Sequence, residues 1–432
     1  MKFLYSDTQD YVDPEYDFIN DRNAPTRQRY WDDRYAHEIM QPTPYDGLLV
    51  AMSAVVPAPG VASSKVRYSI AERRSMLRDG GGGVREFLRL DGPQYKNAMV
   101  MGDCGAFAYV QQEKPAYSPQ EVFEFYAAAR FTHGVSPDHI IFACDTDNPP
   151  REAVEEDIRF RFDLTLENAR EFMRVCKANS MPFEPMGAVQ GWSPKSIAQA
   201  AKQLEDMDYR YLAIGGLVPL KVDVIHKVLR ALRDTIKPET KIHLLGFAKA
   251  DSIQHFTGYG ITSFDSTSPL IRAFMDEKAN YYVPKLDGSL EYYAAIRIPQ
   301  AIENSRLMHG IKEGIFNAED LVKREERALT ALRSFDKGQE TLEATVEAVM
   351  DYQQFLTLGG DSDKHTKSLI KTRLQIERTL AAAPWKHCGC DICAHIGVEV
   401  IIFRSANRNR RRGFHNLGVY HQHVQRILEK SE

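Results

Sequence analysis

Short apolar segments alternate along this chain with longer amphipathic segments. The apolar segments cover 48–54, 98–101, 139–144, 185–189, 211–214, 241–245 and 261–264, and the longer ones include 151–178, 194–207, 220–236 and 250–258. Strand-sized segments that alternate with helix-sized ones predict a parallel sheet with crossover helices. Seven strands in one direction favour an α/β fold of the (β/α)8, or TIM-barrel, type over an open doubly wound sheet.

The 432 residues are too many for one small domain and suit a large barrel with insertions. Residues 1–46, rich in Asp, Tyr and Pro, are predicted to form an N-terminal arm or cap. Residues 47–300 form the barrel and end in a hairpin with Asp287-Gly288 at its turn. Residues 301–384 form a helical insertion with Asn317 as a candidate N-cap. Residues 385–432 form a C-terminal subdomain with a closing helix from about Leu417.

Three of the six cysteines, Cys388, Cys390 and Cys393, fall within six positions of the C-terminal subdomain. Three thiolates and one histidine are a typical tetrahedral ligand set for structural Zn²⁺. We therefore predict a zinc-binding subdomain rather than a chance cluster of cysteines. The spacing alone leaves the fourth ligand open among His387, His395, His415, His421 and His423.

A cluster of arginines lies between these cysteines and His415, in a stretch, 400–428, that has no acidic residue. The formal net charge of -4 gives the whole chain no general affinity for polyanions, so a nucleic-acid partner needs a local basic patch. We predict that the cluster binds nucleic acid, with a solvated charged face as the alternative. Its members are Arg404, Arg408, Arg410, Arg411 and Arg412.

No apolar run approaches the roughly 18 residues that are needed to span a bilayer. The N-terminus also lacks the cationic and apolar parts of a secretion signal. We therefore expect a cytoplasmic protein with no membrane partner. In a reducing compartment Cys104, Cys144 and Cys176 would remain thiols.

The carboxyl ends of the strands are where a barrel carries its chemistry. Polar residues or glycines follow five of the predicted strands, namely Asp103, Asp145, Gln190-Gly191, Gly215-Gly216 and Asp265. Two carboxylates that face one sugar C1′ can perform a retaining displacement, in which one attacks and the other transfers protons. A third carboxylate can accept hydrogen bonds from the N1–H and the amine of guanine, and Phe107 can stack on the base. Each aspartate taken singly could instead cap the next helix.

Five motifs follow one another in a fixed order. They are Asp103-Cys104-Gly105-Ala106-Phe107, Val189-Gln190-Gly191, Ala213-Ile214-Gly215-Gly216-Leu217, Phe264-Asp265-Ser266, and the Cys-x-Cys-x-x-Cys pattern followed by His415-Asn416-Leu417. In sequence and order they resemble the motifs of the tRNA-guanine transglycosylase superfamily. The resemblance implies a (β/α)8 barrel with a zinc subdomain that exchanges guanine in a polynucleotide for a 7-deazaguanine.

The resemblance also implies roles for individual residues. Asp265 would be the nucleophile on C1′ and Asp103 the general acid and base. His415 would be the fourth ligand of a structural Zn²⁺. The substrate-binding residues would be Phe107, Asp145, Gln190, Gly191, Gly215, Gly216 and Leu245, with Phe107 and Leu245 on the two faces of the base.

Three further segments resemble the DpdA branch of the family, whose members act on DNA. They are residues 1–10, the Pro44-Tyr45-Asp46-Gly47 turn and residues 408–416. This branch implies insertion of 7-cyano-7-deazaguanine (preQ0), or a related base, into DNA within a restriction-modification-like system. The alternatives are the same chemistry on tRNA, in the queuosine or archaeosine pathway, and a catalytically silent zinc-containing subunit that binds nucleic acid. Because guanine in a duplex is stacked and paired, a helper protein that opens the duplex is a further expected partner.

Overall fold

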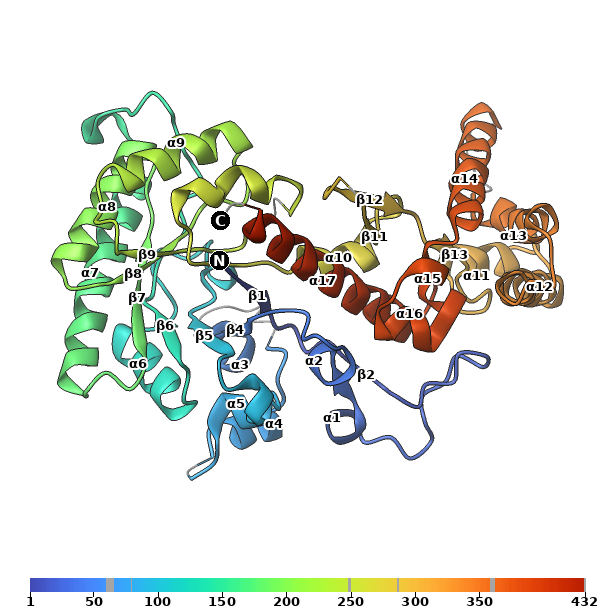
Figure 1. Cartoon of the computed structure of the whole chain (residues 1–432), viewed down its shortest axis with the longest axis horizontal. Coiled ribbons are helices and arrows are strands. Elements are labelled where there is room, and N and C mark those ends of the chain that lie inside the picture. Colours follow the sequence, from blue (N-terminus) through green and yellow to red (C-terminus); the bar gives the residue numbers. More distant parts are fainter. Residues whose placement is uncertain (60–65, 79, 248–249, 286, 358–361, 431–432) are drawn as a thin grey trace. The chain divides into compact units, whose positions relative to one another are not determined.

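Eight parallel strands form a closed barrel in the computed structural model of the chain (Figure 1). The structure describes residues 1–59, 66–78, 80–247, 250–285, 287–357 and 362–430. The strands are β1 (Lys2–Ser6), β4 (Gly47–Ala51), β5 (Met99–Asp103), β6 (His133–Val135), β7 (Glu184–Val189), β8 (Tyr211–Ile214), β9 (Lys241–Leu244) and β10 (Ser263–Asp265). Around the barrel they follow the order β1-β10-β9-β8-β7-β6-β5-β4. The predicted (β/α)8 barrel is confirmed.

Side chains from alternate strand positions fill the interior of the barrel, because successive residues of a strand point to opposite faces. Leu4, Leu49, Met101, Met186 and Tyr211 belong to this buried cluster. Four helices cover the outer side (Figure 1), namely α6 (Pro119–Ala128), α7 (Glu156–Ala178), α8 (Pro194–Asp206) and α9 (Val222–Arg233). With both faces of the sheet buried, the strand ends become the place where polar groups can meet a ligand.

The first barrel strand lies inside the segment that we predicted to be an N-terminal arm. β1 pairs in parallel with β10, with Leu4 opposite Asp265, and with β4, with Tyr5 opposite Leu48. The prediction of an arm over 1–46 is therefore wrong for residues 2–6. The apolar part of β1 is only three residues long, and the polar sequence that follows gives no sign of a strand.

The predicted strand over 139–144 is also wrong, because the strand at this place is β6. His133 pairs with Met101 of β5 and with Glu184 of β7. Gly134, the central residue of β6, is required by close packing, since a Cβ there would lie 2.5 Å from the ring of Tyr126. Glycine weakens the sequence signal of a strand. The sequence therefore predicts the strand in the more apolar run that follows, 139–144. The residues at the carboxyl end of this strand are therefore not the predicted ones.

The chain divides into two compact units whose limits differ from the predicted ones. The barrel unit contains 1–9, 45–267 and 427–432, and the second unit contains 10–44 and 268–426. The barrel thus ends at 267 instead of 300, and most of the predicted arm groups with the C-terminal part. The shorter elements of the barrel unit are α3 (Met52–Val55), α4 (Ile70–Met76), α5 (Gly83–Phe87) and the 3-10 turns Pro93–Tyr95, Ala106–Ala108, Arg151–Ala153 and Ala250–Tyr259.

The second unit contains a hairpin and a group of helices, as predicted. β11 (Tyr281–Pro284) and β12 (Leu290–Tyr293) pair antiparallel. The segment predicted to be helical contains α11 (Ser305–Lys312), α12 (Ala318–Asp336), α13 (Leu342–Thr357) and α14 (Ser362–Ala382). Asn317 caps α12, because its Oδ1 accepts a hydrogen bond from the backbone N–H of Asp320 at 3.0 Å.

The closing helix is α17 (Ala406–Glu429), which begins well before the predicted start at Leu417. Its first turns carry buried arginines and asparagines, so hydrophobic periodicity does not reveal them. The remaining elements of this unit are β2 (Tyr11–Val12), α1 (Arg29–Asp32), β3 (Arg34–Tyr35), α2 (Ala36–Ile39), α10 (Ser268–Met275), β13 (Ile296–Arg297), α15 (Pro384–His387), α16 (Asp391–Ile396), a 3-10 turn (Gly397–Ile401) and β14 (Ile402–Phe403). Among the residues described, every helix is too short or too polar to span a bilayer.

Candidate active site and metal centre

A cavity of about 560 Å³ opens at the carboxyl ends of the barrel strands. Seven of the predicted site residues line it together, namely Asp103, Phe107, Gln190, Gly215, Gly216, Leu245 and Asp265. They come from separate strands and loops and meet only because the barrel closes. A cavity with several carboxylates at this end of a barrel is the expected position of an active site.

Three hydrogen-bond donors hold the carboxylate of Asp265, which is only 5% exposed. Its Oδ2 accepts from Ser6 Oγ at 2.6 Å, and its Oδ1 accepts from the backbone N–H of Gly246 at 2.8 Å. His243 Nε2 lies 3.2 Å from the same Oδ1. The side chain is thus fixed in orientation while it lines the cavity, as a nucleophile requires.

His243 belongs to a buried chain of polar groups that sequence reasoning missed. Its Nδ1 lies 2.6 Å from Ser263 Oγ, which in turn lies 2.6 Å from the hydroxyl of Tyr211. A histidine with both ring nitrogens engaged has a fixed ring orientation. A sequence signal existed, because His243 lies two residues before Leu245 and so faces the same side of its strand. Ser6 was missed because β1 was missed.

Asp103 is half-buried at the end of β5 and lies near the carboxylates of Asp138 and Asp265. Burial raises the pKa of Asp103 to about 7, with further contributions from the negative charges of Asp138 and Asp265. A hydrogen bond of 3.0 Å from the backbone N–H of Gly105 to its Oδ2 acts in the opposite direction. A carboxyl group with a pKa near neutrality can both donate and accept a proton, which is the property of a general acid and base.

Asp138, rather than the predicted Asp145, lines the cavity beside Asp103 and Asp265. Asp138 is 3% exposed, and its Oδ2 accepts a hydrogen bond from Gln190 Nε2 at 2.6 Å. Burial raises the pKa of Asp138. Asp145 is exposed and does not line the cavity in the described part of the chain, and its Oδ1 accepts from the backbone of Asp147. The misplaced strand explains the error, because the true end of β6 leads into Ser136-Pro137-Asp138.

The predicted glycines divide into two kinds. A Cβ on Gly215 would lie 2.1 Å from Gln190 Nε2, and a Cβ on Gly216 would lie 2.5 Å from the carbonyl oxygen of Ile141. Gly216 also has a φ of +73°, which favours glycine. Gly191 does not line the cavity in the residues described; a Cβ there would meet Ile197 of α8. Close packing against α8 thus accounts for the glycine at this position without a bound substrate.

Four side chains of the second unit could hold a metal ion. The Sγ atoms of Cys388, Cys390 and Cys393 and the Nδ1 of His415 all lie within 4.8 Å of one another. His415 Nε2 lies 2.8 Å from the carbonyl oxygen of Tyr282, which fixes the tautomer and leaves the Nδ1 lone pair for a metal. The structure therefore selects His415 among the five candidate histidines.

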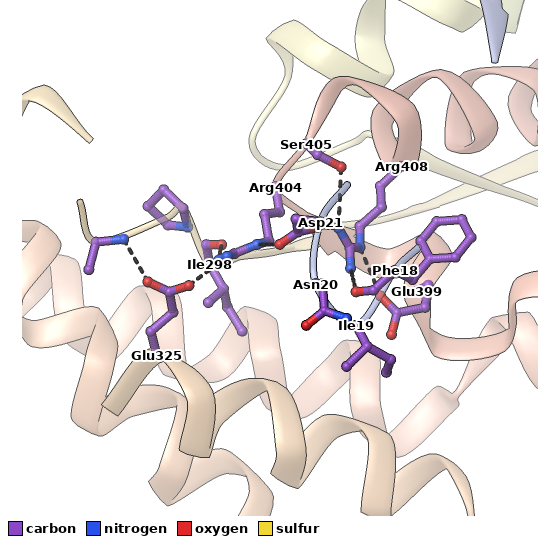
Figure 2. Close-up of polar contacts among 12 residues, drawn as sticks. Phe18, Ile19, Asn20, Asp21, Ile298, Glu325, Glu399, Arg404, Ser405 and Arg408 are labelled. Atoms are coloured by element: carbon purple, nitrogen blue, oxygen red, sulfur yellow. Dashed lines mark hydrogen bonds and ion pairs between the residues drawn. The ribbon is translucent and has the colours of Figure 1, made fainter. Parts of the chain in front are cut away.

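The arginine cluster is not a free surface. Arg404 pairs with Asp21 and Glu325, and Arg408 pairs with Asp21 and Glu399 (Figure 2). The side chains of Arg404 and Arg408 are 7% and 0% exposed. The prediction that they bind nucleic acid is therefore wrong for these two residues, because carboxylates of the same unit neutralise them.

Arg411 and Arg412 are buried as well. Arg411 donates to the carbonyl oxygen of Asp13 at 2.8 Å, and Arg412 donates to that of Ala273 at 2.6 Å. Burial lowers the pKa of Arg412 to about 9. The nucleic-acid prediction is wrong for both residues, and of the five arginines Arg410 alone keeps a side chain that is 28% exposed.

A closed barrel with several carboxylates in its mouth fits an enzyme of the glycosyl-transfer class. Comparison with known proteins gives the family. Residues 67–280 match the family described as Queuine tRNA-ribosyltransferase. The chain is 39% identical over 432 residues to the DNA-guanine transglycosylase of Salmonella montevideo. The aligned region covers 99% of this chain and 97% of that protein. The chain belongs to the guanine transglycosylase family and is a pentosyltransferase.

Similarity to tRNA-acting members covers less of the chain. The tRNA-guanine(15) transglycosylase of Methanopyrus kandleri is 28% identical over 200 residues, which are 45% of this chain and 39% of that protein. The Queuine tRNA-ribosyltransferase of Neisseria meningitidis is 30% identical over 123 residues, which are 28% of this chain and 33% of that protein. The shared part is therefore limited, whereas the similarity to the Salmonella protein extends over the whole length.

Proposed function

We propose that this protein exchanges guanine in DNA for a 7-deazaguanine base such as preQ0, as part of a DNA modification system of the restriction-modification kind. The observation that carries the chemistry is the pair of carboxylates in one cavity, Asp265 held by three donors and Asp103 with a pKa of about 7. The choice of DNA rests on the full-length similarity to a DNA-guanine transglycosylase.

In the proposed reaction, a carboxylate oxygen of Asp265 attacks C1′ of the target nucleotide. A covalent C1′–O bond forms, the bond from C1′ to N9 of guanine breaks, and Asp103 gives its proton to the leaving guanine. The incoming base then loses its N9 proton to Asp103, and its N9 displaces Asp265 from C1′. Two displacements restore the original configuration and both side chains, so the exchange requires no ATP.

We further propose that Asp138 and Gln190 read the edge of the base. The carboxylate of Asp138 can accept hydrogen bonds from N1–H and the exocyclic amine, which guanine and 7-deazaguanines share. Gly215 and Gly216 allow the backbone to approach the base closely. Phe107 and Leu245 line the cavity. The ring of Phe107 can stack on one face of the base, and the methyl groups of Leu245 can pack against the other.

The metal that best fits the Cys₃His group is a structural Zn²⁺. A tetrahedral zinc ion with bonds of ~2.3 Å to sulfur and ~2.0 Å to nitrogen separates those atoms by about 3.5 Å. Nδ1 of His415 lies 3.5, 3.4 and 3.4 Å from the sulfurs of Cys388, Cys390 and Cys393. With four protein ligands the ion would have no open position, so its contribution would be to hold α16 against α17.

The same chemistry on tRNA is the second candidate function, favoured by the family description and the part-length relatives. A catalytically silent subunit is less consistent with the cavity, because both carboxylates are present. In duplex DNA the target guanine must leave the stack, which costs a few kcal/mol. A helper protein that opens the duplex remains a predicted partner for this reason.

Labelled preQ0 distinguishes the candidates. The protein is incubated with plasmid DNA and, separately, with bulk tRNA, and the label in each polymer is counted. We expect label in DNA and background counts in tRNA. Label in tRNA alone would contradict the proposed substrate, and label in neither polymer would favour the silent subunit or a missing helper.

A further inference from the structure

Two exposed phenylalanine rings lie next to each other at the mouth of the cavity. Phe107 is 62% exposed and Phe142 is 43% exposed, and their ring centroids lie 5.9 Å apart at an angle of 45°. An apolar side chain gains stability from burial, so two neighbouring rings left in water are unfavourable for folding alone. Adjacent exposed aromatic rings are typical of a surface that binds a planar partner.

The two rings have different positions with respect to the cavity. Phe107 lines the cavity together with Asp103 and Asp265, so it can face the exchanged base. Phe142 contacts Phe107 but does not itself line the cavity in the described part of the chain. Its ring is therefore placed to meet a group that lies just outside the cavity when the exchanged base lies inside.

The backbone beside Phe142 is fixed by the cavity wall. The N–H of Ile141 donates to Gln190 Oε1 at 3.1 Å. The Ile141 carbonyl approaches Gly216 so closely that a Cβ there would lie 2.5 Å from its oxygen. Phe142 therefore follows a residue that is held from two sides by the groups proposed to read the base.

The mouth also carries a positive charge. Arg67 is exposed, lines the cavity, and donates to the carbonyl oxygen of Thr8 at 3.4 Å. A guanidinium at the rim fits a phosphate of a polynucleotide strand. Exposed rings and a cation around one cavity match a strand whose target base enters the cavity and whose neighbouring nucleotides remain at the mouth.

We propose that Phe142 stacks on the base next to the exchanged guanine and so stabilises the strand from which the guanine has been extruded. This inference rests on the proposed function, because it assigns the neighbouring nucleotide of the same substrate. Stacking of one base on one aromatic side chain changes affinity by on the order of tenfold. The contact is independent of the identity of the neighbouring base, since every base has a flat face.

The experiment combines a change in the protein with a change in the DNA. DNA oligonucleotides with one target guanine carry either natural neighbours or an abasic site at the 5′ or the 3′ neighbour. Incorporation of labelled preQ0 gives kcat and KM for the wild type, Phe142→Ala, Phe142→Tyr and Phe160→Ala. Phe160 is the matched control, since it is 36% exposed on α7 and does not line the cavity in the described residues.

We expect the wild type to show a KM about tenfold higher when one of the two neighbours is abasic. Phe142→Ala should show a similarly raised KM on the natural oligonucleotide and no further rise on the abasic one. Phe142→Tyr and Phe160→Ala should behave like the wild type. A wild type that is indifferent to both abasic sites, or a Phe142→Ala variant that remains sensitive to them, would overturn the stacking contact. A wild type that labels no DNA at all would overturn the proposed substrate, and this inference with it.

Discussion

The barrel mouth and the start of α17 are both rich in charged residues, but their charges are balanced in different ways. Around Arg404 and Arg408, each guanidinium has carboxylate partners in the same unit. In the cavity, the carboxylates of Asp103, Asp138 and Asp265 converge, and the charges of Asp138 and Asp265 help to raise the pKa of Asp103. Neutralised charges hold a structure together, whereas like charges kept close together reduce stability and are retained for chemistry. Charged residues with partners of opposite charge therefore mark the structural region, and carboxylates that lie close to one another mark the candidate active site.

The largest effect should follow the loss of the nucleophile. Asp265→Asn keeps the size of the side chain but removes its charge, so base exchange should fall by on the order of 10⁴-fold or more. The melting temperature should change little, because the amide oxygen can still accept from the backbone N–H of Gly246 while the amide nitrogen donates to the hydroxyl of Ser6. Exchange kinetics and calorimetry measure the two properties, and a residual activity within tenfold of the wild type would contradict the assignment.

A change in the arginine cluster should instead affect the stability of the protein. Arg408→Ala leaves Asp21 and Glu399 short of a buried partner, and the free energy of unfolding should drop by about 3–5 kcal/mol. The matched control is Arg410→Ala, whose side chain lies 3.9 Å from Asp10 and is 28% exposed, with an expected change of about 0.5 kcal/mol. Urea titrations of both variants provide the test. Equal losses of stability would mean that burial does not distinguish the two arginines.

Asp103→Asn should inactivate the enzyme and stabilise it in a pH-dependent way. Because the pKa of Asp103 is raised from 3.8 to about 7 in the folded state, its ionised form is destabilising above pH 7. The variant should therefore be more stable than the wild type by about 2–4 kcal/mol at pH 8. The difference should shrink as the pH falls through 7 and vanish near pH 4. Chemical denaturation at several pH values measures it, and a constant difference would refute the raised pKa.

The smallest predicted effect separates two aspartates of the same region. Asp138→Asn should lower kcat/KM for the incoming base by roughly 10- to 100-fold, since a buried hydrogen bond to a charged group contributes about 1.5–3 kcal/mol. Asp145→Asn, at an exposed site away from the cavity, should leave kcat/KM unchanged. The reverse order of effects would assign base binding to Asp145, as the sequence predicts, instead of Asp138.

The sequence predicts the barrel and much of the site because these depend on local patterns. Asp103 and Asp265 follow clear apolar strands, and the cysteine spacing is recognisable without a structure. β6 cannot be predicted from the sequence, because its central residue is Gly134, which is needed for packing against Tyr126 and has a low strand propensity. Without β6, the sequence does not indicate that Asp138 lies at the end of a strand. Both β1 and Ser6 are hidden by the shortness of the apolar run.

The prediction that the arginine cluster binds nucleic acid is wrong for a different reason. Asp21 lies far from Arg408 in the sequence, and no local pattern reveals that the two side chains meet. A run of arginines without nearby acids resembles a basic surface until the tertiary partners are known. Long-range charge pairing is therefore the kind of contact that a single sequence predicts least well.

The central claim is that Asp265 forms a covalent bond to C1′ of a DNA nucleotide. The most direct measurement is the mass of the protein after incubation with a guanine-containing DNA oligonucleotide in the absence of an incoming base, followed by rapid denaturation and proteolysis. The account predicts a peptide containing Asp265 that carries the oligonucleotide, and no such adduct for Asp265→Asn. An adduct on another residue, or an equal yield of adduct from the variant, would contradict it.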